Sequence, residues 1–417
     1  MGSSALCPSL PRGWQLLVLN LAVYLMLMPP NARGIVESDR GIETLVFEDS
    51  FEDFDLSVWK HELTLSGGGN WQFEYSTNNR SNSWVEDGVL YLQPTLTSDT
   101  IGDDCFSGER SCSLSMWGLT PPDQCTSNAY YGCERQSNAA QRIIINPVQS
   151  AKIYTAESLH VTYGRIEIEA KLPVGDWIWP AIWMLPAHNS YGSWPSSGEI
   201  DIVESRGNSP RYFPGALFSG GHDTMSSTLH WGPYPALNRY HLTTGDFSLP
   251  SRESFGDRFH TFGLSWDETG LYTYVDSDDE RVLSVSFDQD FWTKGGFSDT
   301  EGINNPWRGR GPSAPFDRDF YLIMNVAVGG VNGFFPDNVG AKPWTDHDTD
   351  AALKFWEARE SWLPTWKGLD SALQVLHVAF SWKAIIPCLG TSSYGRKRMI
   401  CTFVCMYICF QFKSRFL

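Results

Sequence analysis

The chain has 417 residues with 48 acidic against 31 basic side chains, a formal net charge of -17. Such a charge argues against a nucleic acid as partner, because phosphate binding relies on clustered Lys and Arg. The length suffices for one large all-β domain with additional segments. The chain contains 18 Trp and 16 Tyr. A large aromatic core would explain them, but flat side chains also stack on the apolar C–H faces of sugars, which suits a carbohydrate cleft.

The first 33 residues predict a secretory signal peptide. Arg12 precedes the apolar run LLVLNLAVYLMLM at residues 16–28, and PPNAR follows with a cleavage site near Ala32. The run is shorter than the roughly 20 residues that a membrane-spanning helix needs. We therefore expect a secreted, extracellular protein without a membrane span.

A polar segment at 99–137 carries four cysteines, Cys105, Cys112, Cys125 and Cys133. In an oxidising compartment an even cluster predicts two disulfides that staple an insertion, with three pairings open. A zinc site is the alternative, but the spacings lack the close C-x-x-C pairs that such sites favour.

Alternating apolar and polar residues predict most of the regular structure as antiparallel strands. The run GRIEIEAKL at 164–172 should place one face on the core and a charged face toward water. A hairpin is expected where two alternating runs flank DETG at 267–270. The expected strands are 45–47, 88–92, 164–172, 260–266, 271–275, 282–287 and the buried central strand 320–328, with one amphipathic helix at 349–362.

The acidic run Glu199-Ile200-Asp201-Ile202-Val203-Glu204 is the main candidate for chemistry. Alternation places Glu199 and Asp201 on one face of a strand. Strict alternation would put Glu204 among the isoleucines, where an unpaired carboxylate is costly to bury. A one-residue bulge near Ile202 or Val203 would turn Glu204 back, so that all three acids line one wall.

Two carboxylates about 5 to 5.5 Å apart are the geometry of a retaining glycoside hydrolase. An acidic strand edge without chemistry would show the same bare motif. The tryptophans upstream, at Trp177, Trp179 and Trp183, together with Pro195 and Gly198 at the strand entry, favour a sugar-binding cleft.

The segments WPAIWMLP and SGEIDIVES resemble the active-site region of glycoside hydrolase family 16, in its laminarinase and β-1,3-glucan-binding-protein branch. The resemblance continues through GGGNWQFEYSTNNRSNSWVEDGVLYLQPT, YGRIEIEAKLP, STLHWG and FYLIMNVAVGG. It implies an all-β jelly-roll sandwich of the lectin type with a concave cleft. It also implies that Glu199 is the nucleophile and Glu204 the general acid and base, with Asp201 between them orienting Glu199.

The same resemblance suggests substrate contacts, each of which has a structural alternative. Trp179 and Trp183 would stack on glucose units, although aromatic side chains are commonly core residues. His230 and Asn70 would contact the sugar, although a lone His is often structural and a loop Asn often caps a turn. Lys152 stands where relatives often show Arg, and because it lacks the planar fork of donors it is not placed in the site.

Two features at the carboxyl end bear on metals. The acids Asp346, Asp348, Asp350 and Glu357 match a calcium loop, but Ala351 occupies the position where the sharp turn needs Gly. We expect helix capping by these acids instead. The family's last strand, which supplies a structural calcium ligand, is replaced after Val375 by LHVAFSWKAIIPCLG, so bound calcium is doubtful and no cofactor is expected.

The expected organisation is a signal peptide at 1–33, a catalytic domain at 41–375 and an atypical tail at 376–417. The tail has three interpretations: an alternative or mis-predicted last exon, which we favour, a lipid-modified tail, or a replacement strand in LHVAF. The expected function is a secreted, monomeric endo-β-1,3-glucanase whose partner is β-1,3-glucan. The alternative is a non-catalytic β-1,3-glucan recognition protein of innate immunity.

Overall fold

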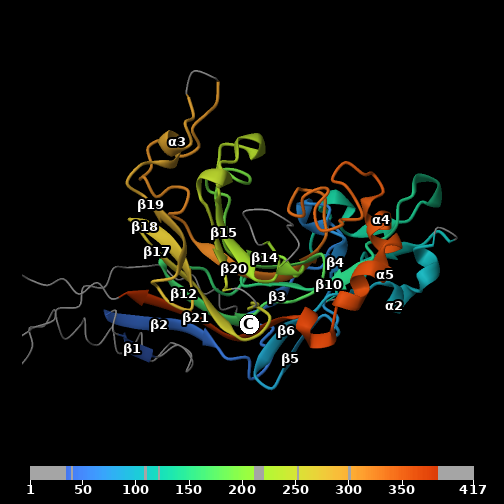
Figure 1. Ribbon diagram of the computed structural model, residues 1–417. Coiled ribbons are helices and arrows are strands. Elements are labelled where there is room, and N and C mark those ends of the chain that lie inside the picture. The colour runs from blue at the N-terminus through green and yellow to red at the C-terminus, as the bar shows by residue number, and fades with distance from the viewer. Residues whose placement is uncertain are drawn as a thin grey trace, which may run out of the picture. The chain divides into compact units, whose positions relative to one another are not determined.

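The computed structural model describes residues 34–38, 41–107, 110–120, 123–210, 220–250, 253–298 and 302–383 (Figure 1). The predicted signal peptide and the tail beyond residue 383 lie outside them. The chain divides into two units, one reaching from Asp49 to Val378 and the other containing the described residues on either side of it. Within the described ranges, no helix has the length and apolar character needed to cross a bilayer.

A seven-stranded sheet forms one layer of the larger unit. Its order is β16-β15-β14-β13-β20-β11-β3, and every neighbouring pair is antiparallel. The strands are β16 (Thr244–Ser248), β15 (Thr224–His230), β14 (Glu199–Ser205), β13 (Ile178–Pro186), β20 (Phe320–Val328), β11 (Lys152–Tyr154) and β3 (Lys60–His61).

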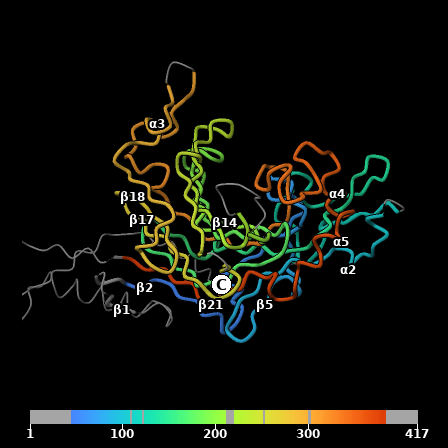
Figure 2. The backbone as a smooth tube through the Cα atoms, in the orientation of Figure 1, coloured from blue at the N-terminus to red at the C-terminus, as the bar shows by residue number. Residues whose placement is uncertain are grey.

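A second antiparallel sheet covers one face of the first. Trp266 of β17 packs edge-on against Phe320 of β20, with ring centroids 5.5 Å apart. Thr273 of β18 donates a 2.8 Å hydrogen bond to Ser227 of β15. The second sheet contains β6 (Val89–Leu92), β5 (Ser83–Glu86), β21 (Leu373–Lys383), β12 (Gly164–Lys171), β17 (His260–Asp267), β18 (Gly270–Val275) and β19 (Arg281–Ser286). The all-β sandwich is thus confirmed, including the predicted hairpin β17–β18 (Figure 2) and the buried strand β20.

The smaller unit contains the antiparallel hairpin of β1 (Gly34–Ser38) and β2 (Gly41–Asp49). Phe47 of β2 meets Phe380, with ring centroids 5.7 Å apart. The segment LHVAF lies inside β21, so it adopts strand structure, as one of the three interpretations of the tail required.

The predicted bulge is confirmed. On the β13 side, Ile182 pairs with Val203 and Trp183 with Asp201, so Ile202 is passed over. On the β15 side, Ile202 and Val203 together oppose the single residue Ser227. Ile202 and Val203 are 1 % and 0 % exposed, which buries both side chains while Glu204 faces away from the core.

The disulfide-stapled insertion and the carboxyl-terminal helices complete the larger unit. The cysteines pair as Cys105–Cys112 and Cys125–Cys133. The remaining strands are β4 (Glu74–Ser76), β7 (Thr95–Leu96), β8 (Ser113–Ser115), β9 (Glu134–Gln136) and β10 (Val148–Ser150). The helices are α2 (Ser98–Ile101), α3 (Phe291–Lys294), α4 (Ala351–Glu357) and α5 (Arg359–Trp362), with 3-10 turns η2 (Gly67–Gly69), η3 (Asp103–Cys105), η4 (Ala129–Tyr131), η5 (Ala139–Gln141), η7 (Pro235–Leu237), η8 (Tyr240–Leu242), η10 (Leu363–Thr365) and η11 (Gly368–Ser371).

Three sequence expectations need correction. The single helix predicted at 349–362 is two helices, because Ala358 leaves helical geometry with ψ 9° and ends α4. Asp350 does not cap this helix with its side chain, since its carboxylate accepts a 2.6 Å bond from Arg142 Nε. Arg165 on β12 does not face water: it is buried and pairs with Glu167 and Asp278.

The bulge depends on a buried hydrogen bond that can be removed. Ser227 is 0 % exposed, and its hydroxyl donates a 2.7 Å bond to the Ile202 carbonyl. Ser227→Ala should leave that carbonyl unpaired and lower the free energy of unfolding by about 1–3 kcal/mol, measured by urea denaturation. Ser284→Ala, on the exposed side of β19, is the matched control. Equal stability of the two variants would show that the bulge does not need this bond.

Candidate active-site cleft

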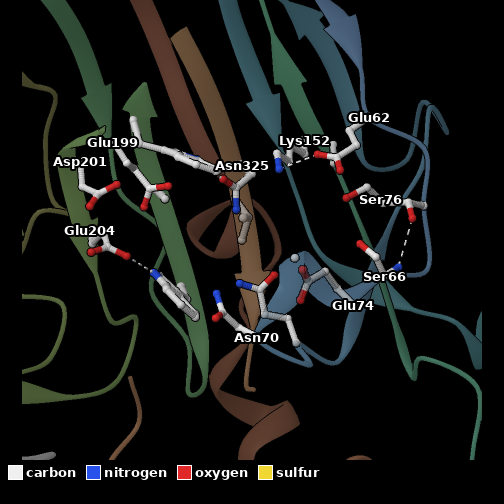
Figure 3. Close-up of a pocket in the computed structure, with 18 residues that line it drawn as sticks. Glu62, Ser66, Asn70, Glu74, Ser76, Lys152, Glu199, Asp201, Glu204 and Asn325 are labelled. Atoms are coloured by element: carbon white, nitrogen blue, oxygen red, sulfur yellow. Dashed lines mark hydrogen bonds and ion pairs between the residues drawn. The ribbon is translucent and has the colours of Figure 1, made fainter. Parts of the chain in front are cut away.

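The face of the seven-stranded sheet that is turned away from the second sheet carries a cleft. Figure 3 shows Glu199, Asp201 and Glu204 along one wall, with Glu62, Ser66 and Ser76 on the other and Asn325 between them. The lining residues are Glu62, Thr64, Ser66, Gly68, Asn70, Gln72, Glu74, Ser76, Ala151, Lys152, Trp179, Ala181, Trp183, Glu199, Asp201, Glu204, Asn325 and Val326. The cleft therefore brings together the three acids, both predicted tryptophans and Asn70.

Two indole N–H groups hold the outer acids. Trp194 Nε1 donates a 3.0 Å hydrogen bond to Glu199 Oε2. Trp179 Nε1 donates an equally long bond to Glu204 Oε1. Each carboxylate keeps a second oxygen for other contacts, so both are oriented without being fully engaged.

His230, at the end of β15, lies beside the acids although it does not line the cleft itself. Its Nε2 is 3.2 Å from Asp201 Oδ2 and 3.7 Å from Glu199 Oε1. Asn238 Nδ2 lies 2.7 Å from His230 Nδ1 and can only donate, so in the neutral ring the proton is on Nε2, the nitrogen that lies close to the acids. The structure thus places His230 where it can stabilise negative charge on the acidic wall.

Burial dominates the electrostatics of the acidic wall. The Glu199 and Asp201 side chains are 14 % and 5 % exposed. Burial, reinforced by the neighbouring Asp201 charge, raises the pKa of Glu199 to about 8. Burial also raises the pKa of Asp201 well above its usual range, with Glu204 as the second cause. The pKa of Glu204 is raised by burial against the opposing effects of His230, Trp179 and Arg206. Near neutral pH Glu199 therefore retains its proton, and burial favours the protonated forms of Asp201 and Glu204 as well.

Trp179 is packed from behind by a layered stack. It is 6 % exposed, and the Phe334 ring lies parallel to it with centroids 3.8 Å apart and an interplanar angle of 7°. The Arg206 guanidinium covers Phe334 at 4.2 Å and donates through Nε to the Phe334 carbonyl at 2.8 Å. Little of the Trp179 ring is left for a sugar to stack on, whereas its N–H is fixed toward Glu204.

Trp183 is more accessible and belongs to a polar cluster across the cleft. Its Nε1 donates a 2.7 Å bond to Asn325 Oδ1. Lys152 lies over the Trp183 ring at 4.9 Å and pairs with Glu62 at 2.5 Å. The ammonium group of Lys152 therefore sits in the cleft, which corrects the expectation that Lys152 lies outside the site.

Sequence reasoning missed most of the wall opposite the acids. Every second residue from Glu62 to Ser76 lines the cleft. The intervening Leu63, Leu65, Phe73 and Tyr75 are 0–7 % exposed. This period of two was available in the sequence, but the glycines of the loop at 67–69 interrupt it. Glu74 on this wall accepts a 2.8 Å bond from the Val328 N–H, and burial raises its pKa to about 8.

The atoms of Glu199, Asp201 and His230 could also hold a cation, since one ligand atom from each lies within 4.8 Å of the others. Two carboxylates and an imidazole are a donor set that a transition metal accepts. The same groups are equally suited to proton transfer, so metal binding and acid–base chemistry are both open to this cluster.

Comparisons with known proteins agree with this geometry. A family model described as glycosyl hydrolases family 16 matches residues 125–294. A β-1,3-glucan-binding protein of Penaeus monodon is 44% identical over 371 residues, which cover 87% of this chain and 97% of that protein. A glucan endo-1,3-β-glucosidase of Cryptopygus antarcticus is 31% identical over 317 residues, 75% of this chain and 88% of that protein. Other relatives are longer, and the chain spans 63% and 34% of two of them.

Among solved structures, the catalytic domain of an endo-1,3-β-glucanase (laminarinase) from Thermotoga petrophila RKU-1 superposes with a TM-score of 0.52. The match covers 84% of this chain and 99% of that one at 24% identity. At this identity the similarity concerns the fold, and it agrees with the predicted jelly-roll sandwich.

The raised pKa of Glu199 predicts how stability depends on pH. The folded state keeps the Glu199 proton up to about pH 8, whereas an unfolded Glu loses it near 4.5, so this contribution to stability is lost as the pH rises between those values. Glu199→Gln needs no proton. Its melting temperature should exceed that of the unchanged protein at pH 8, and the gap should close toward pH 5. Glu253→Gln, at an exposed position, is the control. A gap that does not depend on pH would contradict the assignment.

Proposed function

This chain belongs to glycoside hydrolase family 16, and from its cleft we propose that it is a secreted, retaining endo-β-1,3-glucanase. The observation that carries the proposal is the acidic wall, in which Glu199, Asp201 and Glu204 share one face of β14. Each outer carboxyl is held by its own indole N–H. A pair of oriented carboxyls beside a polar cleft is what double displacement at an anomeric carbon requires.

In the proposed reaction Glu199 attacks the anomeric carbon and forms a covalent glycosyl-enzyme. Glu204 gives its proton to the leaving oxygen and later takes one from the attacking water. The working state has the charge on Glu199 and the proton on Glu204. The Trp194 N–H and the His230 edge favour that charge, opposing the burial that raises the Glu199 pKa. Because both groups must hold one particular protonation state, activity should be confined to a window of pH.

Asp201 is proposed to keep the charge of the wall low. Its side chain is more deeply buried than that of Glu199, at 5 % exposed against 14 %. A protonated Asp201 can donate to Glu199, whereas a charged Asp201 would oppose ionisation of Glu199. His230 Nε2, 3.2 Å from Asp201 Oδ2, would compensate any charge that forms there.

The wall opposite the acids is proposed to bind glucan hydroxyl groups. Apart from Gly68, it presents side-chain donors and acceptors at alternate positions from Glu62 to Ser76, including Asn70, and it carries the Lys152 ammonium group. Trp183 is the better placed of the two predicted stacking residues, because Trp179 is stacked on Phe334. The catalytic domain at 41–375, the monomeric state and the absence of a required metal are part of the proposal.

A second candidate, β-1,3-glucan recognition without hydrolysis, is favoured by one finding. The relative that is 44% identical over 371 residues carries the name of a glucan-binding protein. This function predicts binding of laminarin without new reducing ends. One reducing-sugar assay on the purified protein therefore separates the two candidates, and repeating it with EDTA tests whether the Glu199, Asp201 and His230 cluster needs a metal.

Glu199→Gln and Glu204→Gln should each lower laminarin turnover at least about 10³-fold while laminarin binding is kept, because each removes an ionisable group that makes or breaks a bond. The products of the unchanged protein should appear first as β anomers by NMR, as retention requires.

The control for these variants is Glu134→Gln, at an exposed position on β9. Undiminished turnover in either cleft variant, or an early α anomer, would overturn the assignment of the two carboxyls.

Trp179→Phe should separate the hydrogen bond to Glu204 from the packing behind it. The phenyl ring can still stack on Phe334, but the donor to the charged form of Glu204 is lost, so the pKa of Glu204 should rise. The basic limb of the kcat/KM profile, where the general acid loses its proton, should move to higher pH. A profile that falls in height without moving would assign Trp179 to packing alone.

A further inference from the structure

Three exposed aromatic side chains lie where the stapled insertion meets the cleft wall. Trp71, Tyr130 and Tyr131 are 49 %, 53 % and 77 % exposed. Trp71 and Tyr130 touch edge to face, with ring centroids 5.8 Å apart. Single exposed aromatics are ordinary, but an exposed contacting pair drawn from two distant segments, with a third exposed ring next to it in the chain, calls for a cause.

All three residues are held in left-handed backbone geometry, with φ of 53° at Trp71, 53° at Tyr130 and 61° at Tyr131. Bulky side chains seldom adopt this region, and its strain persists where the surrounding structure over-determines it. Hiding these rings from water cannot be the reason, because they are exposed. The strained backbone therefore holds these three side chains in positions where they face solvent.

The insertion is fastened to the cleft wall itself. The Leu65 N–H donates to the Gly132 carbonyl at 2.7 Å, and the Thr126 N–H donates to the Leu63 carbonyl at 2.9 Å. A Cβ on Gly132 would come within 2.2 Å of the Thr64 hydroxyl, so only glycine permits this approach. The disulfide Cys125–Cys133 closes the loop that carries both tyrosines.

The aromatic pair lies next to the loop that lines the cleft. Gly68 and Asn70 line the cleft, and Trp71 is the next residue along the chain. The Tyr130 ring lies 3.8 Å from where a Gly69 side chain would begin. Arg135, the cation beside the tyrosines, directs its guanidinium to Asn146 Oδ1 and the Tyr130 carbonyl. What remains exposed is flat and apolar, which suits a neutral sugar chain more than a charged ligand.

We propose that Trp71, Tyr130 and Tyr131 form an aromatic platform that binds glucose units of a β-1,3-glucan chain beyond the cleft. The inference rests on the proposed glucan function. It assigns the stapled insertion a role in holding polymer, because a chain long enough to leave the cleft would stack its sugar faces on these rings. Short oligosaccharides would fill the cleft without reaching the platform.

The test measures binding of laminarin and of laminaritriose by calorimetry, with Glu199→Gln present in every protein to prevent hydrolysis. Adding Trp71→Ala and Tyr130→Ala should weaken laminarin binding about tenfold, corresponding to ~1.4 kcal/mol for two lost stacking contacts, and leave laminaritriose binding unchanged. Trp117→Ala, which removes a 52 % exposed tryptophan from the same insertion, is the matched control and should bind laminarin normally.

A Tyr130→Gly variant guards against a folding defect. Glycine accepts the left-handed geometry, so its melting temperature should not fall although laminarin binding weakens. Unchanged laminarin affinity in the double variant would overturn the platform. Equal weakening of laminarin and laminaritriose binding would also overturn it, as would an equal loss of laminarin binding in Trp117→Ala. If the parent protein binds neither ligand, the proposed glucan function itself fails, and the two failures are thereby distinguished.

Discussion

The site depends on one irregularity in strand pairing. Ile202 and Val203 occupy the space of one residue opposite Ser227, and this changes the face on which Glu204 emerges. Both bulge side chains are buried, so hydrophobic packing fixes the register as firmly as the hydrogen bonds do. A strand that kept strict alternation would place Glu204 in the layer between the sheets. The core and the acidic wall are thus two consequences of one constraint.

Burial opposes ionisation of the three acids, whereas the hydrogen-bond donors around them favour the charged form of particular carboxyls. Burial raises the pKa of Glu199, Asp201 and Glu204 alike. Indole N–H groups, unlike ammonium or guanidinium groups, favour a carboxylate without adding a full charge. The site can therefore move a single proton or charge among three carboxyls at modest cost. A wall lined with cations would fix all three as carboxylates and leave no general acid.

Much of the fold and the acidic wall could be predicted because their signals are local. Alternation located β12, β17 and β18, a continuous apolar run located the buried strand β20, and parity required the bulge at Ile202 and Val203. What the sequence did not yield depends on contacts distant in the chain. Phe334 could not be assigned to Trp179, since these two residues are 155 positions apart and meet only through folding. Arg165 looked solvent-facing because its partner Asp278 lies on a different segment.

The wall opposite the acids has an alternating sequence pattern that was not recognised, because a glycine loop interrupts it. Polar residues recur at every second position from Glu62 to Ser76 except at Gly68, because the glycines at 67–69 carry positive φ and form a turn there. The alternation survives because η2 returns the chain in phase, and the Gln72 N–H closes the turn by donating to the Gly67 carbonyl at 3.1 Å. A glycine loop inside an alternating run can therefore continue a binding wall. The same turn places Trp71 directly after the cleft-lining Asn70 and in contact with Tyr130, so the segment that completes the wall also carries part of the proposed aromatic platform.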